Sequence, residues 1–292
     1  MSVLTLFNQH PWLLPVSLLL LGLVVGSFIN LVILRLPVML EREERSFCGE
    51  LLGVETGKSE RFDLVRPGSH CPDCGHSIRA WENIPLISYL LLRGHCSHCG
   101  AHISLRYPLI EFFSGLLIVC LGLHYGQASP QLLGAMLLTW GLLALGMIDL
   151  DTGTLPDAIT LPLLWLGLMF NLFGTFASLP DAVLGAMAGY LSLWAVYWIF
   201  KWLTGKRGMG HGDFKLTAAL GAWLGWQALP LIILLSSLAG LAGAMLMLLL
   251  RRRSRSAPIP FGPWLAGAGW VALLWGAPMM AWYWRSIGLP NP

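Results

Sequence analysis

Four aspartates of this sequence lie where apolar segments meet short polar loops. Two end one apolar run in Ile148-Asp-Leu-Asp151, one opens the next run in Leu155-Pro-Asp157, and one is in Gly208-Met-Gly-His-Gly-Asp-Phe-Lys215. A charged side chain costs roughly 2.5–3.5 kcal/mol at the middle of a membrane span and less near its ends. Two carboxylates that face each other can share a proton and activate water. The pattern therefore indicates acid–base chemistry at a membrane edge.

Asp149 and Asp213 are the best candidates for such a pair. Asp149 and Asp151 are two residues apart, so they cannot share a helix face, and Asp149 is closer to the apolar run. Asp157 follows Pro156 at a helix start, where the helix dipole favours an acid. The glycines before Asp213 leave room for another chain to approach. A flexible loop in which Asp213 caps a helix also fits this spacing.

A second group of residues has the spacing of a metal site. Two Cys-x-x-Cys pairs, each followed by glycine, supply four thiolates: Cys71, Cys74, Cys96 and Cys99. Four sulfur ligands suit tetrahedral zinc and leave no open coordination position, so the predicted zinc is structural. The alternative is a pair of disulfides, which a reducing cytoplasm disfavours.

The elements that must position these residues are membrane helices. Apolar residues make up 56% of the 292 residues and charged residues 11%, and the mean hydropathy is +0.68. A soluble globular domain needs more polar surface than this. Most of the apolar runs approach the ~20 residues that cross about 30 Å of hydrocarbon. The eight runs lie near 13–34, 108–124, 131–148, 157–174, 181–200, 214–226, 229–250 and 263–284, and 214–226 is the weakest.

The basic residues orient these runs. Of 18 lysines and arginines, 17 fall in the segments 35–106, 201–215 and 251–261. The positive-inside rule places these segments in the cytoplasm. Both termini then lie on the other side of the membrane, and the four aspartates lie at its cytoplasmic edge. The first run lacks a basic n-region, so we expect a retained span and not a removable signal peptide.

We therefore predict an all-α polytopic membrane protein with about eight transmembrane helices and a small cytoplasmic zinc-ribbon-like module. The predicted parts are a first transmembrane helix at 1–34, the zinc-binding module at 35–106 and a transmembrane domain at 107–292. Within the module, the apolar stretch 84–92 is too short to span. It is expected to lie along the membrane surface or to fill the core of the module.

Polar residues inside two runs need partners. Gly26-Ser-Phe-Ile-Asn30 places small and amide residues on one helix, for packing against another helix or for function. Glu111 lies about one turn inside the second span, so we expect a partner such as Arg106 or a polar cavity. An ion pair and a substrate contact both remain open for Glu111.

Several of these stretches together resemble the bacterial type IV prepilin leader peptidases. The resemblance covers about residue 13 to residue 284, in order, and is specific only for the set as a whole. The Gly-x-Gly-Asp aspartate is also similar to that of presenilins and archaeal preflagellin peptidases. The stretches are Gly26-Ser-Phe-Ile-Asn30, the two cysteine pairs, Ser104-Leu-Arg-Tyr-Pro108 with Glu111, Ile148-Asp149, Leu155-Pro156, Gly208–Lys215 and Ile259-Pro-Phe-Gly-Pro263.

The resemblance implies an intramembrane aspartic endopeptidase whose catalytic pair is Asp149 and Asp213. Its substrates would be type IV prepilins and type II secretion pseudopilins, cut after a glycine at the cytoplasmic edge of the bacterial inner membrane. Many members also methylate the new N-terminal residue from S-adenosylmethionine. The implied cofactors are structural zinc and S-adenosylmethionine, and the partners are pilins and membrane lipid, with no nucleic acid. The sequence has no Gly-x-Gly-x-x-Gly on a strand–helix unit, so no residue is assigned to the methyl donor.

Two other classes of protein fit part of the pattern. A proton-coupled transporter also uses carboxylates within the membrane. A membrane metalloprotease would place catalysis on zinc, but the sequence has no His-Glu-x-x-His motif and four thiolates leave no open site.

Overall fold

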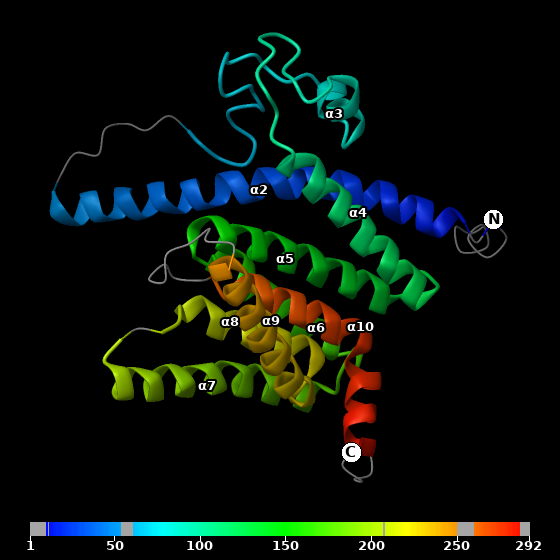
Figure 1. Ribbon diagram of the computed structural model, residues 1–292, viewed down its shortest axis with the longest axis vertical. Helices are drawn as coiled ribbons and strands as arrows, with labels where there is room; N and C mark the ends of the chain where they lie inside the picture. The colour runs from blue at the N-terminus through cyan, green and yellow to red at the C-terminus, as the bar shows by residue number, and fades with distance from the viewer. Residues whose placement is uncertain (1–9, 11, 54–60, 207, 250–259, 287–292) are drawn as a thin grey trace. The chain divides into compact units, whose positions relative to one another are not determined.

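The computed structural model of the chain describes residues 10, 12–53, 61–206, 208–249 and 260–286. Within these ranges the chain is helical, with loops between the helices and two isolated bridges in place of strands. It divides into two compact units, Met1–Ala128 and Ser129–Pro292 (Figure 1).

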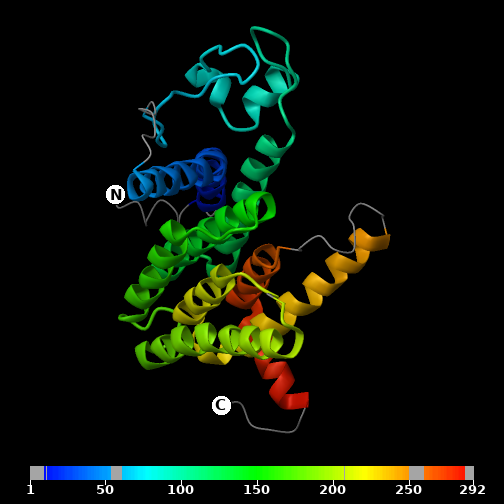
Figure 2. The ribbon, with the colours of Figure 1, turned by 90° about the vertical axis from the view of Figure 1, so that its left-hand side faces the viewer.

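The first unit is built on α2 (Leu13–Leu52) and α4 (Arg106–Tyr125), which cross in contact (Figures 1 and 2). α2 is longer than predicted, because the helix continues past residue 34 to Leu52. This extension is charged, and Glu41 and Arg45 form an ion pair one turn apart at 2.5 Å. Such pairs stabilise an exposed helix where apolar burial does not.

Small residues set the crossing of α2 and α4. A Cβ atom on Gly22 would lie 2.7 Å from the Cα of Gly115. Ser114 Oγ donates to the carbonyl oxygen of Gly22 at 2.6 Å, and Asn30 Nδ2 donates to that of Tyr107 at 3.0 Å. Close approach and side-chain hydrogen bonds are how membrane helices associate. Asn30 thus has the packing role that was one of its two predicted roles.

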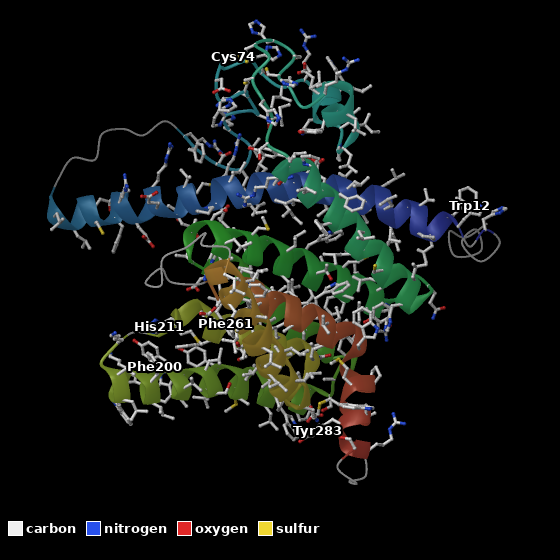
Figure 3. The ribbon with its side chains drawn as sticks, in the orientation of Figure 1. Trp12, Cys74, Phe200, His211, Phe261 and Tyr283 are labelled. Atoms are coloured by element: carbon white, nitrogen blue, oxygen red, sulfur yellow. The ribbon has the colours of Figure 1, made fainter. Side chains whose placement is uncertain are left out.

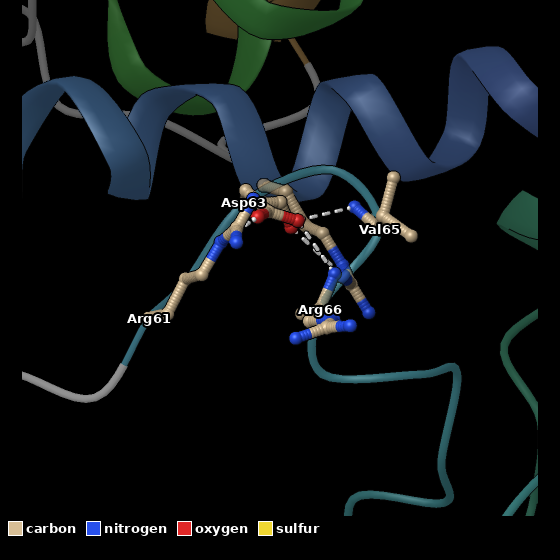
Figure 4. Close-up of polar contacts among 5 residues, drawn as sticks. Arg61, Asp63, Val65 and Arg66 are labelled. Atoms are coloured by element: carbon tan, nitrogen blue, oxygen red, sulfur yellow. Dashed lines mark hydrogen bonds and ion pairs between the residues drawn. The ribbon is translucent and has the colours of Figure 1, made fainter.

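A turn around Asp63 returns the chain to α2 (Figure 4). Asp63 Oδ1 accepts the N–H groups of Arg66 at 2.6 Å and Val65 at 2.7 Å, and Oδ2 accepts Arg61 Nε at 2.7 Å. These hydrogen bonds, that from the Arg66 N–H first, lower the pKa of the Asp63 carboxyl. Arg35 of α2 donates to the Asp63 carbonyl oxygen at 3.0 Å, which fixes the turn to the helix.

The rest of the module has two short helices, η1 (Ala80–Asn83) and α3 (Ile87–Leu91). α3 has five residues, so the prediction that 84–92 does not span is confirmed. Leu90 is 74% exposed and Leu91 71% exposed. The alternative that this stretch fills the core of the module is therefore wrong for these two leucines.

The second unit is arranged around a short buried helix, α8. Residues Asp213 to Trp223 of α8 are all buried except Lys215. α8 packs against α6, α7, α9 and α10. The described helices of this unit are α5 (Pro130–Thr152), α6 (Asp157–Asn171), α7 (Leu179–Thr204), α8 (His211–Leu224), the short η2 (Trp226–Ala228), α9 (Leu229–Leu249) and α10 (Gly262–Ser286).

Glycines and one amide hold α8 in place. A Cβ atom on Gly221 would lie 2.1 Å from the carbonyl oxygen of Gly185 on α7, so the two backbones touch. Asn171 of α6 donates from Nδ2 to the carbonyl oxygens of Ala222 at 2.8 Å and Trp223 at 2.9 Å. These last carbonyls of α8 have no partner within their own helix. The helix end is therefore satisfied in a buried setting.

All eight predicted runs are helices, which confirms the all-α class. Among the described residues, six helices are long and apolar enough to cross a membrane. The predicted spans near 157–174 and 214–226 are the exceptions, because α6 has 15 residues and α8 has 14. Three segments that were used to predict the orientation in the membrane lie outside the described residues. They are the N-terminal residues 1–9, the basic residues Arg251 to Arg255 and the C-terminal residues 287–292.

Candidate active site and metal centre

Asp149 lies in the last turn of α5. Ser129 caps the start of this helix by accepting the Leu132 N–H at 3.2 Å, and Gly153 ends it with φ 68°. Asp149 is 5% exposed, and its Oδ2 accepts the N–H of Gly262, the first residue of α10, at 2.9 Å. Asp151, two residues on, is exposed. The prediction that Asp149 is the more desolvated acid of the two is confirmed.

Asp213 lies in the first turn of α8 and is 7% exposed. The Gly210 N–H donates to its carboxylate, and the charge of Asp149 acts on it. α8 begins at His211 with Gly210 at the cap position, so Asp213 lies within the helix and not in a loop, and its carboxylate caps the helix through the Gly210 N–H. The second unit thus contains two buried carboxylates, from different helices, that interact electrostatically.

The glycines before Asp213 provide space. None of the three has a positive φ in the structure. A Cβ atom on Gly212 would lie 2.7 Å from Leu155 Cβ, and one on Gly208 would lie 2.7 Å from a ring carbon of Phe200. The sequence predicted that the glycines let another chain approach closely. At Gly208 and Gly212 the close neighbours are instead residues of this chain. Gly210 remains exposed beside the Asp213 carboxylate.

An ion pair between α6 and α8 was not predicted. Lys215 Nζ donates to both carboxylate oxygens of Asp157, at 2.6 and 2.7 Å. Asp157 is in the first turn of α6, as expected, so its helix-dipole role and the ion pair coexist. The sequence feature that could have indicated this ion pair is the lysine two residues after Asp213, which lies on the face of α8 that is not buried.

His211 lies at the exposed start of α8 and packs against aromatic rings (Figure 3). Its ring centroid is 5.3 Å from that of Tyr197 and 5.4 Å from that of Phe214.

Glu111, in the first unit, has a backbone partner. Its Oε2 accepts the N–H of Leu86 at 2.9 Å, and the Ser27 side chain also hydrogen-bonds to it. The carboxylate therefore connects the loop before α3 to α4 and α2. Sequence alone could not find this partner, because any backbone N–H can serve.

The four cysteine sulfurs lie together, as the spacing predicted. The Sγ atoms are within 4.8 Å of one another, and those of Cys71 and Cys99 are 3.9 Å apart. Tetrahedral zinc with Zn–S bonds of about 2.3 Å places its sulfurs ~3.8 Å apart. The cysteines are free thiols, against the disulfide alternative. The four cysteines therefore fit a structural zinc ion. Figure 3 labels one of them, Cys74.

The two halves of the metal site have the same backbone design. Gly75 donates to the carbonyl oxygen of Cys71 at 2.9 Å with φ 69°, and Gly100 donates to that of Cys96 at 3.0 Å with φ 73°. The N–H groups of Cys99 and His98 lower the pKa of the Cys96 thiol to about 7. These N–H groups favour the thiolate form of Cys96, which is the form that binds metal.

The sequence comparisons agree with this arrangement. Residues 20–125 match the family model of the bacterial peptidase A24 N-terminal domain, and residues 136–245 match that of the type IV leader peptidase family. The chain is 56% identical to the prepilin leader peptidase/N-methyltransferase of Pseudomonas aeruginosa, over 94% of this chain and 95% of that protein.

Other relatives are similar over the same extent. Identity is 55% to the protein of the same name from Stutzerimonas stutzeri, over 97% of this chain and 98% of that protein. It is 50% to the one from Dickeya chrysanthemi, over 94% of this chain and 97% of that protein. No solved structure matches the chain. The chain belongs to the type IV leader peptidase family.

Proposed function

We propose that this protein is an intramembrane aspartic endopeptidase that removes the basic leader of type IV prepilins and type II secretion pseudopilins. The observation that carries the proposal is the pair of buried, interacting carboxylates, Asp149 on α5 and Asp213 on α8. It is supported by near-full-length relatives that are named prepilin leader peptidase/N-methyltransferase. The transporter has no comparable support from the family match.

The proposed reaction is general acid–base hydrolysis of one peptide bond. The ionised member of the pair takes a proton from a water molecule as its oxygen attacks the scissile carbonyl carbon. The protonated member donates its proton to the carbonyl oxygen, which gives a neutral tetrahedral intermediate. When this intermediate collapses, the C–N bond breaks and the leaving amine takes the proton that came from the water. The other carboxylate takes back a proton from a hydroxyl group of the intermediate as the carbonyl group re-forms. The two carboxylates then return to their starting state.

The substrate would enter where α8 begins. A prepilin has a basic leader in the cytoplasm and an apolar helix in the bilayer, so its cleavage site is at the membrane edge. Gly210 is exposed beside the Asp213 carboxylate, and it offers an extended substrate strand a stretch of backbone with no side chain. We place this end of α8 at the cytoplasmic face of the inner membrane, with both chain termini in the periplasm, on the distribution of lysine and arginine.

We also propose that the protein N-methylates the new N-terminal residue, with S-adenosylmethionine as the methyl donor. The basis is the name shared by the relatives, and we assign no residue to the donor site. Zinc held by Cys71, Cys74, Cys96 and Cys99 would have a structural role, because four thiolates close its coordination shell.

Mass spectrometry of a prepilin after incubation with the purified protein tests both activities. We expect loss of the leader without S-adenosylmethionine, and a further 14 Da (about one methylene) on the mature chain with it. An unchanged substrate mass, combined with proton-coupled uptake into proteoliposomes, would support the transporter and reject the peptidase. Leader loss without the mass gain under any condition would reject methylation alone.

A further inference from the structure

The start of α10 has no role in the reaction proposed above. The carbonyl oxygen of Phe261 accepts the Trp264 N–H at 3.1 Å, so Gly262 is the first residue of this helix. An N–H group at this position has no partner within its own helix, and the next residue, Pro263, has no N–H group at all. The Gly262 N–H donates instead to Oδ2 of Asp149 at 2.9 Å, in a buried contact.

A residue with a side chain does not fit at position 262. A Cβ atom there would lie 2.7 Å from Asp149 Oδ2, 3.0 Å from Asp149 Cγ and 3.1 Å from Leu155 Cδ2. Either the start of the helix or the Asp149 carboxylate would have to move. Leu155 also touches Gly212, the residue before Asp213. The glycine therefore lies where the surroundings of both carboxylates meet.

The two helices come together at this point. On α5, a Cβ atom on Gly146 would lie 3.6 Å from the Cα of Pro263 and 3.7 Å from the Cβ of Ala266. Gly146 precedes Asp149 by three residues, so both lie on the α5 face that meets α10. The N–H donor is consequently held by a packed helix and not by a loop.

We propose that Gly262 is the positioning residue for Asp149: its N–H holds Oδ2 and leaves Oδ1 to take the proton from water. This inference rests on the proposed role of Asp149 in leader cleavage. A hydrogen bond from an N–H group to a carboxylate is roughly twice as strong as a neutral one. A donor that is already in place orients a reacting group without reorganisation during the reaction.

Gly262→Ala tests the proposal, with Gly267→Ala on the same helix as the matched control. A Cβ atom on Gly267 would meet nothing within 4 Å. We expect Gly262→Ala to lower kcat for prepilin cleavage about 100-fold with KM within about threefold, because small displacements of a reacting group cost this much. Gly267→Ala should keep both constants. A kcat for Gly262→Ala within about threefold of the control overturns the proposal, even if the variant unfolds at a lower temperature.

A spectroscopic measurement decides the case if Gly262→Ala does not accumulate in folded form. Labelling phenylalanine at its carbonyl carbon with ¹³C and glycine with ¹⁵N selects the two Phe-Gly bonds of the chain, at Gly174 and Gly262. In Asp149→Ala the Gly262 amide proton should move upfield, because its acceptor is gone, while that of Gly174 stays in place. An unmoved Gly262 resonance overturns the proposal. Leader cleavage by Asp149→Ala at the wild-type rate would reject the proposed function, whichever way that resonance behaves.

Discussion

The cysteine site and the aspartate pair are built in opposite ways. Each half of the cysteine site is a short turn with its own backbone hydrogen bonds, such as that from Gly75 to Cys71. Asp149 and Asp213 lie on different helices, and their partners are the N–H groups of Gly262 and Gly210. The first site depends on local geometry, and the second depends on how α5, α8 and α10 pack. Damage to helix packing should therefore harm the aspartate pair more than the metal site.

The largest expected effect is at the pair itself. Asp213→Asn and Asp149→Asn should each lower the rate of leader cleavage by several orders of magnitude, because an amide can neither ionise nor donate an acidic proton. Both variants should still be inserted in the membrane and contain zinc, since the metal site is built locally. The rates are measured by mass spectrometry of the cleaved prepilin.

Asp151→Asn is the matched control, because its side chain is exposed only two residues from Asp149. It should retain most of the cleavage rate. If Asp213→Asn cleaves at a near-wild-type rate, or if Asp151→Asn is inactive while Asp149→Asn is active, the wrong carboxylates have been paired.

The second prediction concerns the metal. Purified protein should contain about one zinc ion per chain, and Cys71→Ser or Cys96→Ser should lose most of it, because three thiolates bind zinc far less well than four. The zinc-binding module should then become more sensitive to proteolysis, whereas the second unit should not. Elemental analysis and limited proteolysis measure this, with Cys120→Ser in α4 as the control that keeps its zinc.

Methylation by these cysteine variants sharpens the contrast between the two sites. If the module serves methyl transfer, loss of zinc should reduce methylation at least as much as leader cleavage. A methylated product from a variant whose zinc site is destroyed would contradict this. Fully reduced wild-type protein without zinc would contradict the assignment of the metal site itself.

A third prediction concerns the packing around α8. Gly221→Ala should destabilise the protein by about 3 kcal/mol, because the added Cβ would lie 2.1 Å from a backbone oxygen of α7. Cleavage should fall with the folded fraction, and zinc content should not change. Thermal unfolding in detergent measures the shift, and Gly267→Ala, whose added Cβ meets nothing within 4 Å, should not be destabilised. Loss of zinc in Gly221→Ala would mean that the two sites are not independent.

The smallest expected effect is at the Lys215–Asp157 ion pair. Its side chains are 31% and 54% exposed, so solvent screening limits its contribution to about 0.2–1 kcal/mol. Asp157→Asn and Lys215→Met should therefore cleave prepilin at a rate within about tenfold of wild type. A larger loss in both variants would show that the pair fixes the position of α8 beside Asp149.

Features that depend on spacing along the chain could be predicted from the sequence. Two Cys-x-x-Cys pairs place four sulfurs around one point through short turns, and apolar runs near 20 residues define helices. The order of polar and apolar residues also predicted that Asp149 is more buried than Asp151. The same signals led to the family, because its motifs are short stretches in a fixed order.

The surroundings of these residues depend on how the helices pack, and the sequence did not predict them. α8 was predicted as a weak span, but it is a short helix buried among other helices. The contact of Gly262 with Asp149 joins residues far apart in the sequence. In a membrane protein the surface that faces lipid is as apolar as the core, so hydropathy does not show which helix is central. Backbone donors such as Gly262 carry no sequence signal, because almost every residue has an N–H group.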